Sequence, residues 1–299
     1  MLSKLISRVK TEKQQNTQDI RGKQPDSTSY QELEKTYLTS RSINFDDLSK
    51  YRVSSVDAVY YIPNYITEDD EKYLLGCIDS QPSERWSILQ HANRRLQRWG
   101  GEVTPKGLEN IEALPPWLEK ISETLSSEKI TEKKTNHVLL NEYPPGIGIM
   151  PHTDGPLYHP YVVILSLGSH ACFEFFKDYA NYKAEQNVAK LLVEPRSLLI
   201  FEKEAYTKFL HSIHDSVLDS IEVTYTIDKS NNSVKITSSN IDNIHLTKIY
   251  GEIQKELESG SNNSQDEKEF TKTWQLKRTK RISLTIRYVI PSNAPKDES

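Results

Sequence analysis

Short apolar runs separated by Gly and Pro turns dominate the second half of the chain, and they limit its fold more than any other feature. The runs cover residues 137–143, 161–167, 171–176, 188–193 and 197–201. Each has the length of a strand and is rich in Val, Ile, Leu, Tyr or Phe, as β-strands are. Many short strands in succession indicate a double-sheet jelly roll or a related barrel. We therefore predict a mainly β (α+β) fold with a jelly-roll or cupin-like core.

Helices are predicted N-terminal to these strands, after a first strand at residues 58–62. Residues 67–70, Thr-Glu-Asp-Asp, resemble a capping box. The helix that follows has an apolar stripe consisting of Tyr73, Leu74, Cys77 and Ile78. A second helix begins at the Pro-Pro pair 115–116, where proline is tolerated. Its apolar face consists of Trp117, Leu118, Ile121 and Leu125.

The polar segments of the chain suggest its domain boundaries. Mean hydropathy is −0.65 and only 36% of residues are hydrophobic, so long stretches add nothing to a core. We predict a disordered extension at residues 1–54, one domain at 55–291 and a short tail at 292–299. Residues 229–275 are rich in Asn, Ser, Lys and Glu, which predicts a low-complexity insertion looping out of the sheet. A modest helix is expected within it, over residues 241–257.

Charge and cysteine content exclude several classes of protein. A net charge of −4 argues against a generally basic nucleic-acid binder, so any such contact needs a local patch. Two cysteines form no disulfide framework, which fits a reducing compartment. No apolar run has the length of a membrane span. We expect a monomer in the nucleus and cytoplasm. A mitochondrial presequence at residues 1–10 is the less favoured alternative.

A His-x-Asp triplet follows a Pro-Pro-Gly turn at the end of the 137–143 strand. On a strand, residues two apart share a face, so His152 and Asp154 can bind one metal ion from the same side. With a further His, this gives the facial site of non-haem Fe(II) oxygenases. The triplet alone is weak, because a solvated loop can contain the same residues by chance. His211 and His214 are the rival third ligands. Three apart on a strand, they face opposite sides, so only one can bind.

Arginines late in the chain supply a second chemical signal. Arg281 and Arg287 are six apart on a predicted strand and share a face. A guanidinium pairs bidentately with a carboxylate, as a dicarboxylate such as 2-oxoglutarate would require. Asn141 and Tyr143, which share a face just before the triplet, add hydrogen-bonding groups.

The segment 93–101 places three arginines beside a tryptophan and a Gly-Gly hinge. As a loop, Arg94, Arg95, Arg98 and Trp99 could hold phosphates and stack a base. A solvated edge with one buried Trp is the equally weighted alternative.

The chain resembles the AlkB-like family of Fe(II)/2-oxoglutarate dioxygenases, most closely the eukaryotic AlkB homologue 6 group. The matching motifs lie at residues 96–101, 136–158, 166–170, 192–199, 205–211 and 281–287. The resemblance implies a double-stranded β-helix, with iron bound by His152, Asp154 and His211. It implies that Arg281 binds the distal carboxylate of 2-oxoglutarate. The same wall would be completed by Asn141, Tyr143, Ser283 and Arg287.

The resemblance also implies an activity and a substrate class. With Fe(II), 2-oxoglutarate and O2, the enzyme would demethylate an N-alkylated base in RNA or DNA. Tyr158 and His159 are candidates for the mouth of the substrate pocket. The alternatives are a protein hydroxylase or demethylase, and a nucleic-acid-binding pseudoenzyme with a vestigial iron site. One departure from the family is the long separation between His211 and Arg281, which requires the insertion to leave strand pairing intact.

Overall fold

The computed structural model describes residues 27–39, 48–53, 55–228, 233–258 and 269–292. The presequence considered at residues 1–10 lies outside these ranges, as does the tail after residue 292. Within the described ranges, none of the helices is long and apolar enough to cross a membrane.

Strands make up most of the described elements. They are β1 Val59–Ile62, β2 Ser87–Leu89, β3 Arg94–Trp99, β4 Glu102–Thr104, β5 Gly107–Glu109, β6 His137–Tyr143, β7 Ile149–His152, β8 Tyr161–Leu167, β9 Ala171–Phe176, β10 Ala189–Val193, β11 Leu198–Glu202, β12 Leu210–Ile213, β13 Leu218–Asp228, β14 Ser233–Ser239, β15 Glu269–Lys277 and β16 Arg281–Arg287. The α-helices are α2 Ser27–Thr36, α3 Glu68–Asp79, α4 Pro116–Ser127, α5 Tyr179–Lys183, α6 Lys203–Thr207 and α7 Lys248–Glu258.

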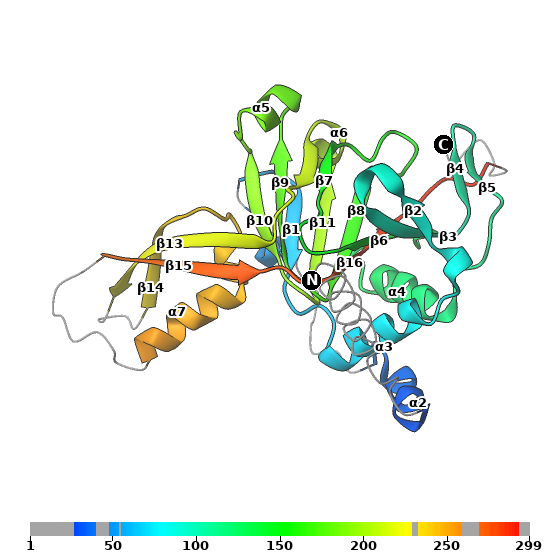
Figure 1. Ribbon diagram of the computed structural model, residues 1–299, viewed down its shortest axis with the longest axis horizontal. Coiled ribbons are helices and arrows are strands. Elements are labelled where there is room, and N and C mark those ends of the chain that lie inside the picture. Colours follow the sequence, from blue (N-terminus) through cyan, green and yellow to red (C-terminus); the bar gives the residue numbers. More distant parts are fainter. Residues whose placement is uncertain (1–26, 40–47, 54, 229–232, 259–268, 293–299) are drawn as a thin grey trace, which may run out of the picture.

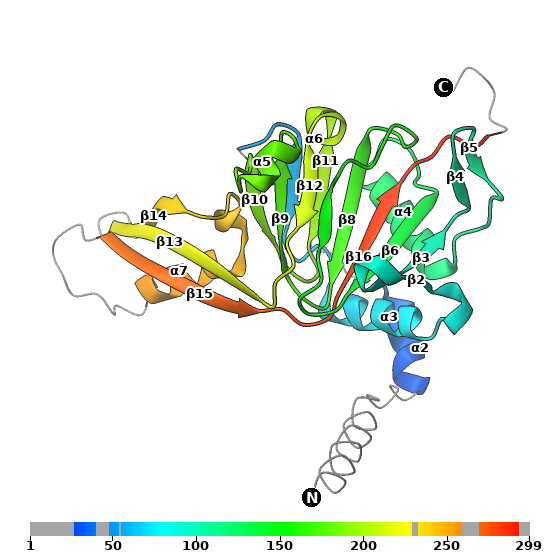
Figure 2. The same ribbon diagram turned by 45° about the horizontal axis from the view of Figure 1, so that its top comes forward.

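Two antiparallel sheets form the core (Figures 1 and 2). The larger has the order β1-β11-β8-β16-β6-β3-β2, and the smaller has the order β10-β9-β12-β7. Inward side chains of both sheets meet in one apolar cluster, which includes Val162 of β8, Phe175 of β9 and Leu191 of β10. The predicted mainly β, double-sheet core with N-terminal helices is therefore confirmed.

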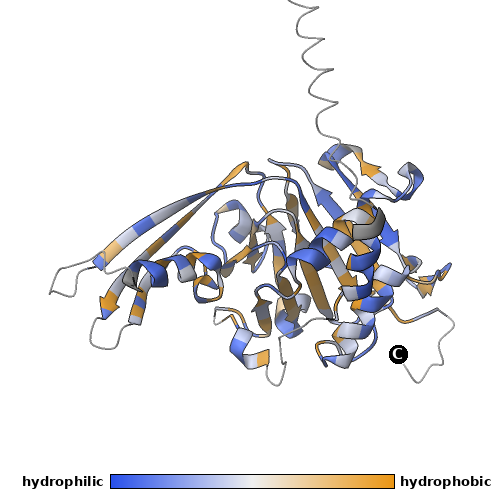
Figure 3. Ribbon diagram, turned by 90° about the horizontal axis from the view of Figure 1, so that it is seen from below, coloured by the Kyte–Doolittle hydropathy of each residue, from blue (hydrophilic) through white to orange (hydrophobic). Residues whose placement is uncertain are grey.

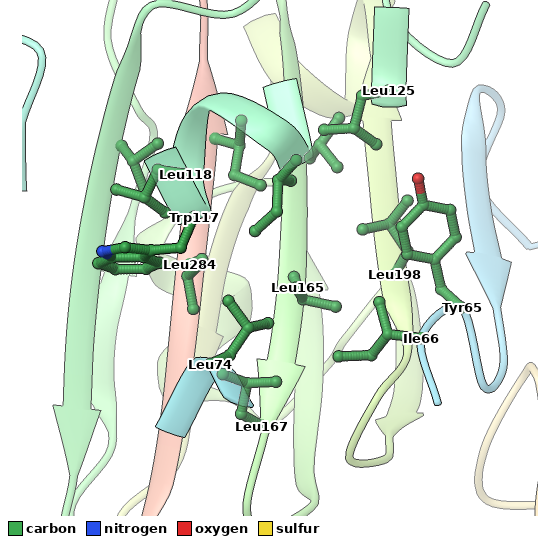
Figure 4. Close-up of a cluster of buried hydrophobic side chains, with 14 of the residues drawn as sticks. Tyr65, Ile66, Leu74, Trp117, Leu118, Leu125, Leu165, Leu167, Leu198 and Leu284 are labelled. Atoms are coloured by element: carbon green, nitrogen blue, oxygen red, sulfur yellow. The ribbon is translucent and has the colours of Figure 1, made fainter. Parts of the chain in front are cut away.

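The outer face of the larger sheet is covered by α3 and α4 (Figure 4). Trp117 and Leu118 of α4 and Leu74 of α3 pack against Leu165 and Leu284 of the sheet. Burying one such side chain contributes about 1.5–3 kcal/mol. The capping box predicted for α3 is present, because the Thr67 hydroxyl accepts from the Asp70 amide and the Asp70 carboxylate accepts from the Thr67 amide.

The prediction of disorder over residues 1–54 does not hold for the described residues 27–39. Part of the extension is ordered, since α2 packs against α3 and the segment after α2 is buried. The Tyr37 hydroxyl donates to the Trp117 carbonyl at 3.1 Å, and the Leu38 amide donates to the Asp70 carboxylate at 2.8 Å. Residues 27–39 therefore cover the same helices that cover the sheet.

The insertion is larger and better ordered than predicted. It starts at Leu218 and forms a sheet of order β14-β13-β15, with α7 packed on one face. Burial alternates along β13, and hydrophobic and hydrophilic residues are interspersed along the ribbon of this sheet (Figure 3). The buried face supplies a small apolar core that includes Ile221 and Val223. The side-chain amide of Asn243 accepts a hydrogen bond from the backbone N–H of Leu192 and donates one to the backbone carbonyl of Leu192, at 3.0 Å each. The insertion thereby covers the exposed edge of β10.

The insertion leaves the pairing of β16 intact, as the prediction required. In the β16–β6 ladder Arg281 lies opposite Tyr143, and Ser283 lies opposite Asn141. These four side chains consequently share the inner face of the larger sheet.

Candidate active site

A pocket of about 780 Å³ opens between the two sheets. One wall comes from β3, β6 and β16 of the larger sheet, and the other from β7 and β12 of the smaller sheet. Polar and charged side chains occupy two separate positions inside it. One is a cluster of possible metal ligands, and the other is a group of cations and hydroxyls.

The cluster of possible ligands consists of His152, Asp154 and His211. One ligand atom from each lies within 4.8 Å of the others. His152 and His211 are direct partners in the pairing of β7 with β12. Gly148 allows these strands to approach closely, because a Cβ atom there would lie 1.9 Å from the Ile213 carbonyl oxygen. Strand pairing thus brings together ligands that are far apart in the sequence.

The donor atoms in this cluster suit a divalent metal. One oxygen of Asp154 forms an ion pair with Arg287, while its other oxygen is buried without a partner. His152 Nδ1 lies 2.8 Å from the Met150 carbonyl, which fixes the ring and leaves Nε2 available. Burial lowers the pKa of both His152 and His211. The imidazoles are therefore neutral, as metal binding requires. Two imidazoles and one carboxylate fit Fe(II) with open positions.

The second polar group is built around a buried cation. Arg281 Nη2 donates to the Ser166 hydroxyl at 2.9 Å, and its Nε has no partner. Arg94 donates to the Tyr143 hydroxyl at 3.3 Å. Burial lowers the pKa of Arg281 to about 10, so its guanidinium still carries a charge at neutral pH. No carboxylate of the described residues forms a salt bridge with it, which leaves this end of the pocket ready for an anion.

The residues predicted for the co-substrate wall line the same pocket. They are Asn141, Tyr143, Arg281, Ser283 and Arg287. Arg287 differs from the rest because it lies at the metal end, where it pairs with Asp154.

The segment 94–99 is a strand and not the predicted loop, so its side chains alternate between two faces. Arg94 lines the pocket. Arg95 points the other way, where it pairs with Glu142 at 2.7 and 2.9 Å and lies over Trp86. Trp99 is only 8% exposed and packs edge-on against Trp117. The predicted base stacking by Trp99 is therefore wrong, and the buried-Trp alternative applies.

The remaining sequence candidates have different positions. Arg98 is exposed and lies on the same face of β3 as Arg94, but it is not among the residues that line the pocket. Tyr158 lines the pocket 4.4 Å from the Arg287 guanidinium. His159 packs against Tyr161 and Tyr288 and is not among the lining residues, so its role at the mouth of the pocket stays a prediction.

His214 does not belong to the possible metal ligands. Its Nε2 lies 2.8 Å from the Glu174 carboxylate, and the side chain lies at the pocket wall. His214 follows the end of β12 and lines the same pocket as His211, but only His211 belongs to the cluster of possible ligands.

Ser166 is a site residue that the sequence patterns do not assign to the pocket. It orients Arg281, and its signal was available as the lone polar residue within the apolar strand Tyr161–Leu167.

Comparison with known proteins gives consistent matches. Residues 58–287 match the family described as the 2OG-Fe(II) oxygenase superfamily. A zebrafish (Danio rerio) protein, "Probable RNA/DNA demethylase ALKBH6", is 43% identical over 176 residues, covering 56% of this chain and 74% of its own. "Uncharacterized protein L905" of Acanthamoeba polyphaga mimivirus is 31% identical over 173 residues, covering 57% of this chain and 79% of its own. The solved structure of OsALKBH1 is 14% identical and covers 77% of this chain and 96% of its own, with a TM-score of 0.43.

Proposed function

Because the chain belongs to the 2OG-Fe(II) oxygenase superfamily, we propose that it oxidatively removes an alkyl group from a nitrogen of a base in RNA or DNA. The observation that carries this proposal is the combination of two features in one pocket. A buried Asp154 oxygen without a partner stands beside two neutral imidazoles, and the buried Arg281 cation stands at the other end. The name of the zebrafish relative supports the substrate class.

The protein's own residues have distinct tasks in this reaction. His152, Asp154 and His211 would hold Fe(II), which would supply O2-dependent oxidation driven by 2-oxoglutarate. Arg287 pairs with one oxygen of Asp154, and the other oxygen, which has no partner, would bind the metal. Arg281, oriented by Ser166, binds the distal carboxylate of 2-oxoglutarate.

Hydrogen-bonding groups beside Arg281 complete the co-substrate site. Asn141, Tyr143 and Ser283 lie on the paired strands β6 and β16 next to Arg281. Apolar lining residues, including Leu139, Ile164 and Phe173, exclude water from the reacting atoms.

The substrate reaches the metal through the open end of the pocket. A base in a stacked helix cannot enter, so it must be unstacked or single-stranded. The pocket volume of about 780 Å³ lies in the range of small-molecule sites and accommodates a co-substrate together with a base. Arg94 provides a cation on the wall for a phosphate.

The test is turnover with the purified full chain, Fe(II), ascorbate, O2 and labelled 2-oxoglutarate. We expect labelled succinate, and formaldehyde when an N-methylated single-stranded oligonucleotide is added. The His152→Ala/Asp154→Ala variant should give neither, whereas His245→Ala, a matched histidine change in the insertion, should behave like the wild type.

The outcomes separate the competing functions. Succinate without formaldehyde from any methylated oligonucleotide would contradict the substrate class and favour a protein hydroxylase. No succinate above the double variant would contradict the enzyme and favour a pseudoenzyme.

A further inference from the structure

Three aromatic rings form a ladder from the surface into the pocket. Tyr179 and Tyr182 lie on α5, and His214 follows β12. The centroids of Tyr179 and Tyr182 are 5.7 Å apart at an interplanar angle of 32°. Those of Tyr182 and His214 are 5.3 Å apart at 11°. Tyr182 and His214 line the pocket, while Tyr179 is 47% exposed.

The inner rings of this ladder are held rigidly. The Nε2 atom of His214 lies 2.8 Å from the Glu174 carboxylate. The backbone carbonyl of His214 accepts a hydrogen bond from Arg278 at 2.8 Å. Phe176 contacts both Tyr182 and His214 edge-on. These contacts hold Tyr182 and His214 in place, and the exposed ring of Tyr179 packs against Tyr182.

The chemistry of the ladder favours a nucleobase as its occupant. Tyr182 and His214 are stacked, and Tyr179 is tilted by 32° against Tyr182. An exposed aromatic face can stack a base, and such stacking tolerates any base sequence. Lys183 is exposed and its ammonium lies 5.1 Å from the Tyr179 ring, which adds a cation at the solvent end. Tyr182 and His214 line the same pocket as the cluster of possible metal ligands, so the ladder adjoins the space in which a base would bind.

We propose that the Tyr179–Tyr182–His214 ladder is a stacking platform for an unpaired base adjacent to the base bound in the pocket. This inference rests on the proposed function and deepens it, because it specifies single-stranded nucleic acid as the substrate. Tyr179 makes the contact, while Tyr182 and His214 support it from behind.

The test measures binding of labelled single-stranded DNA and RNA, each with one N-methylated base, to the full chain with Fe(II) and 2-oxoglutarate without O2. Removing a stacking ring costs about 1–3 kcal/mol, equivalent to about 5- to 150-fold in affinity. Tyr179→Ala should therefore weaken binding by this factor, while Tyr179→Phe keeps it. Tyr250→Ala, a matched change on α7, should bind like the wild type. Because the ring is uncharged, the dependence of affinity on salt should not change.

An abasic position beside the methylated base provides a second measurement. The abasic oligonucleotide should bind the wild type more weakly than the complete one does. It should bind Tyr179→Ala no more weakly than the complete oligonucleotide does, because the base and the ring are the two sides of one contact. Thermal unfolding verifies that each variant is folded.

Failure of the platform and failure of the proposed function give different results. If the wild type binds and demethylates the oligonucleotide while Tyr179→Ala binds equally well, the platform is refuted and the function stands. If the wild type neither binds nor demethylates any oligonucleotide, both are refuted.

Discussion

Replacing Arg281 by Met should stabilise the ligand-free protein and abolish its response to 2-oxoglutarate. The side chain is 3% exposed. Its Nη2 donates to Ser166, its Nε has no partner, and no carboxylate in the part of the chain that the structure describes forms a salt bridge with it. A buried cation without a counter-charge is unfavourable, and it becomes favourable only when an anion binds.

The size of the effect follows from the pKa. Burial lowers the pKa of Arg281 from 12.5 to about 10, and at about 1.4 kcal/mol for each tenfold change in proton affinity this is a penalty of about 3 kcal/mol. Met avoids the penalty but loses the hydrogen bond to Ser166, worth about 1 kcal/mol. The variant should therefore be more stable by about 2 kcal/mol. For a chain of this size that raises the unfolding midpoint by about 4 °C.

Thermal unfolding of the metal-loaded and metal-free proteins, with and without 2-oxoglutarate, measures both effects. A ligand at 100 times its Kd adds about 2.7 kcal/mol to the stability of the wild type and should add nothing to Arg281→Met at that concentration. Arg287→Met is the matched control. Its guanidinium is paired with Asp154, so its loss leaves an uncompensated carboxylate and should lower metal-free stability by about 3 kcal/mol.

The reasoning would be refuted if Arg281→Met lowered the midpoint and the midpoint still rose with 2-oxoglutarate. Arg281 would then be a structural cation, and the carboxylate would bind elsewhere.

Three further changes test other parts of the structure. Gly148→Ala places a Cβ against the Ile213 carbonyl, so β7 should move away from β12. The affinity for Fe(II), measured in an anaerobic titration, should then fall roughly tenfold or more. Gly251→Ala is the control, because Gly251 has open space around it, and it should leave the affinity unchanged. Burial, together with the charge of Arg287, lowers the pKa of His137 to about 4. Between about pH 4 and 6.5 the unfolded chain therefore carries a proton on this imidazole that the native state does not. The free energy of unfolding of the metal-free protein should therefore decrease as the pH is lowered from about 6.5 to 4. In denaturant titrations His137→Phe should lose about 3 kcal/mol less of this free energy over the same range; equal losses would contradict the burial argument. Asn243→Ala removes both hydrogen bonds to Leu192, so unfolding should require about 1–3 kcal/mol less and the Leu192 amide should exchange faster; an unchanged exchange rate would show that the edge of β10 is covered by other contacts.

Local pattern predicted the strands and helices of the core closely. The run Tyr161–Leu167 was predicted within the same limits that β8 has, because its composition and bounding turns are properties of neighbouring residues. The capping box at Thr67 is local in the same way. The predictions failed where neighbouring residues carry too little information. The burial of Tyr37 and Leu38 depends on contacts with α3 and α4, and these helices lie far along the chain.

Sequence by itself determined which chemical groups are available and which of them share a face. Arg281, Ser283 and Arg287 are separated by even numbers of residues on β16, so their side chains had to point the same way wherever that strand paired. Asp154 follows the end of β7, so strand alternation alone did not place it beside His152.

Only the tertiary structure decided where those faces meet. The register of β3 against β6 turned Arg94 into the pocket and Trp99 into the core, although both belong to one basic, aromatic segment. The pairing of β12 with β7 placed His211 beside His152 and left His214 to the aromatic ladder. The physical reason is that side-chain direction repeats locally along a strand, whereas strand register is set by contacts between residues that the sequence separates by tens of positions.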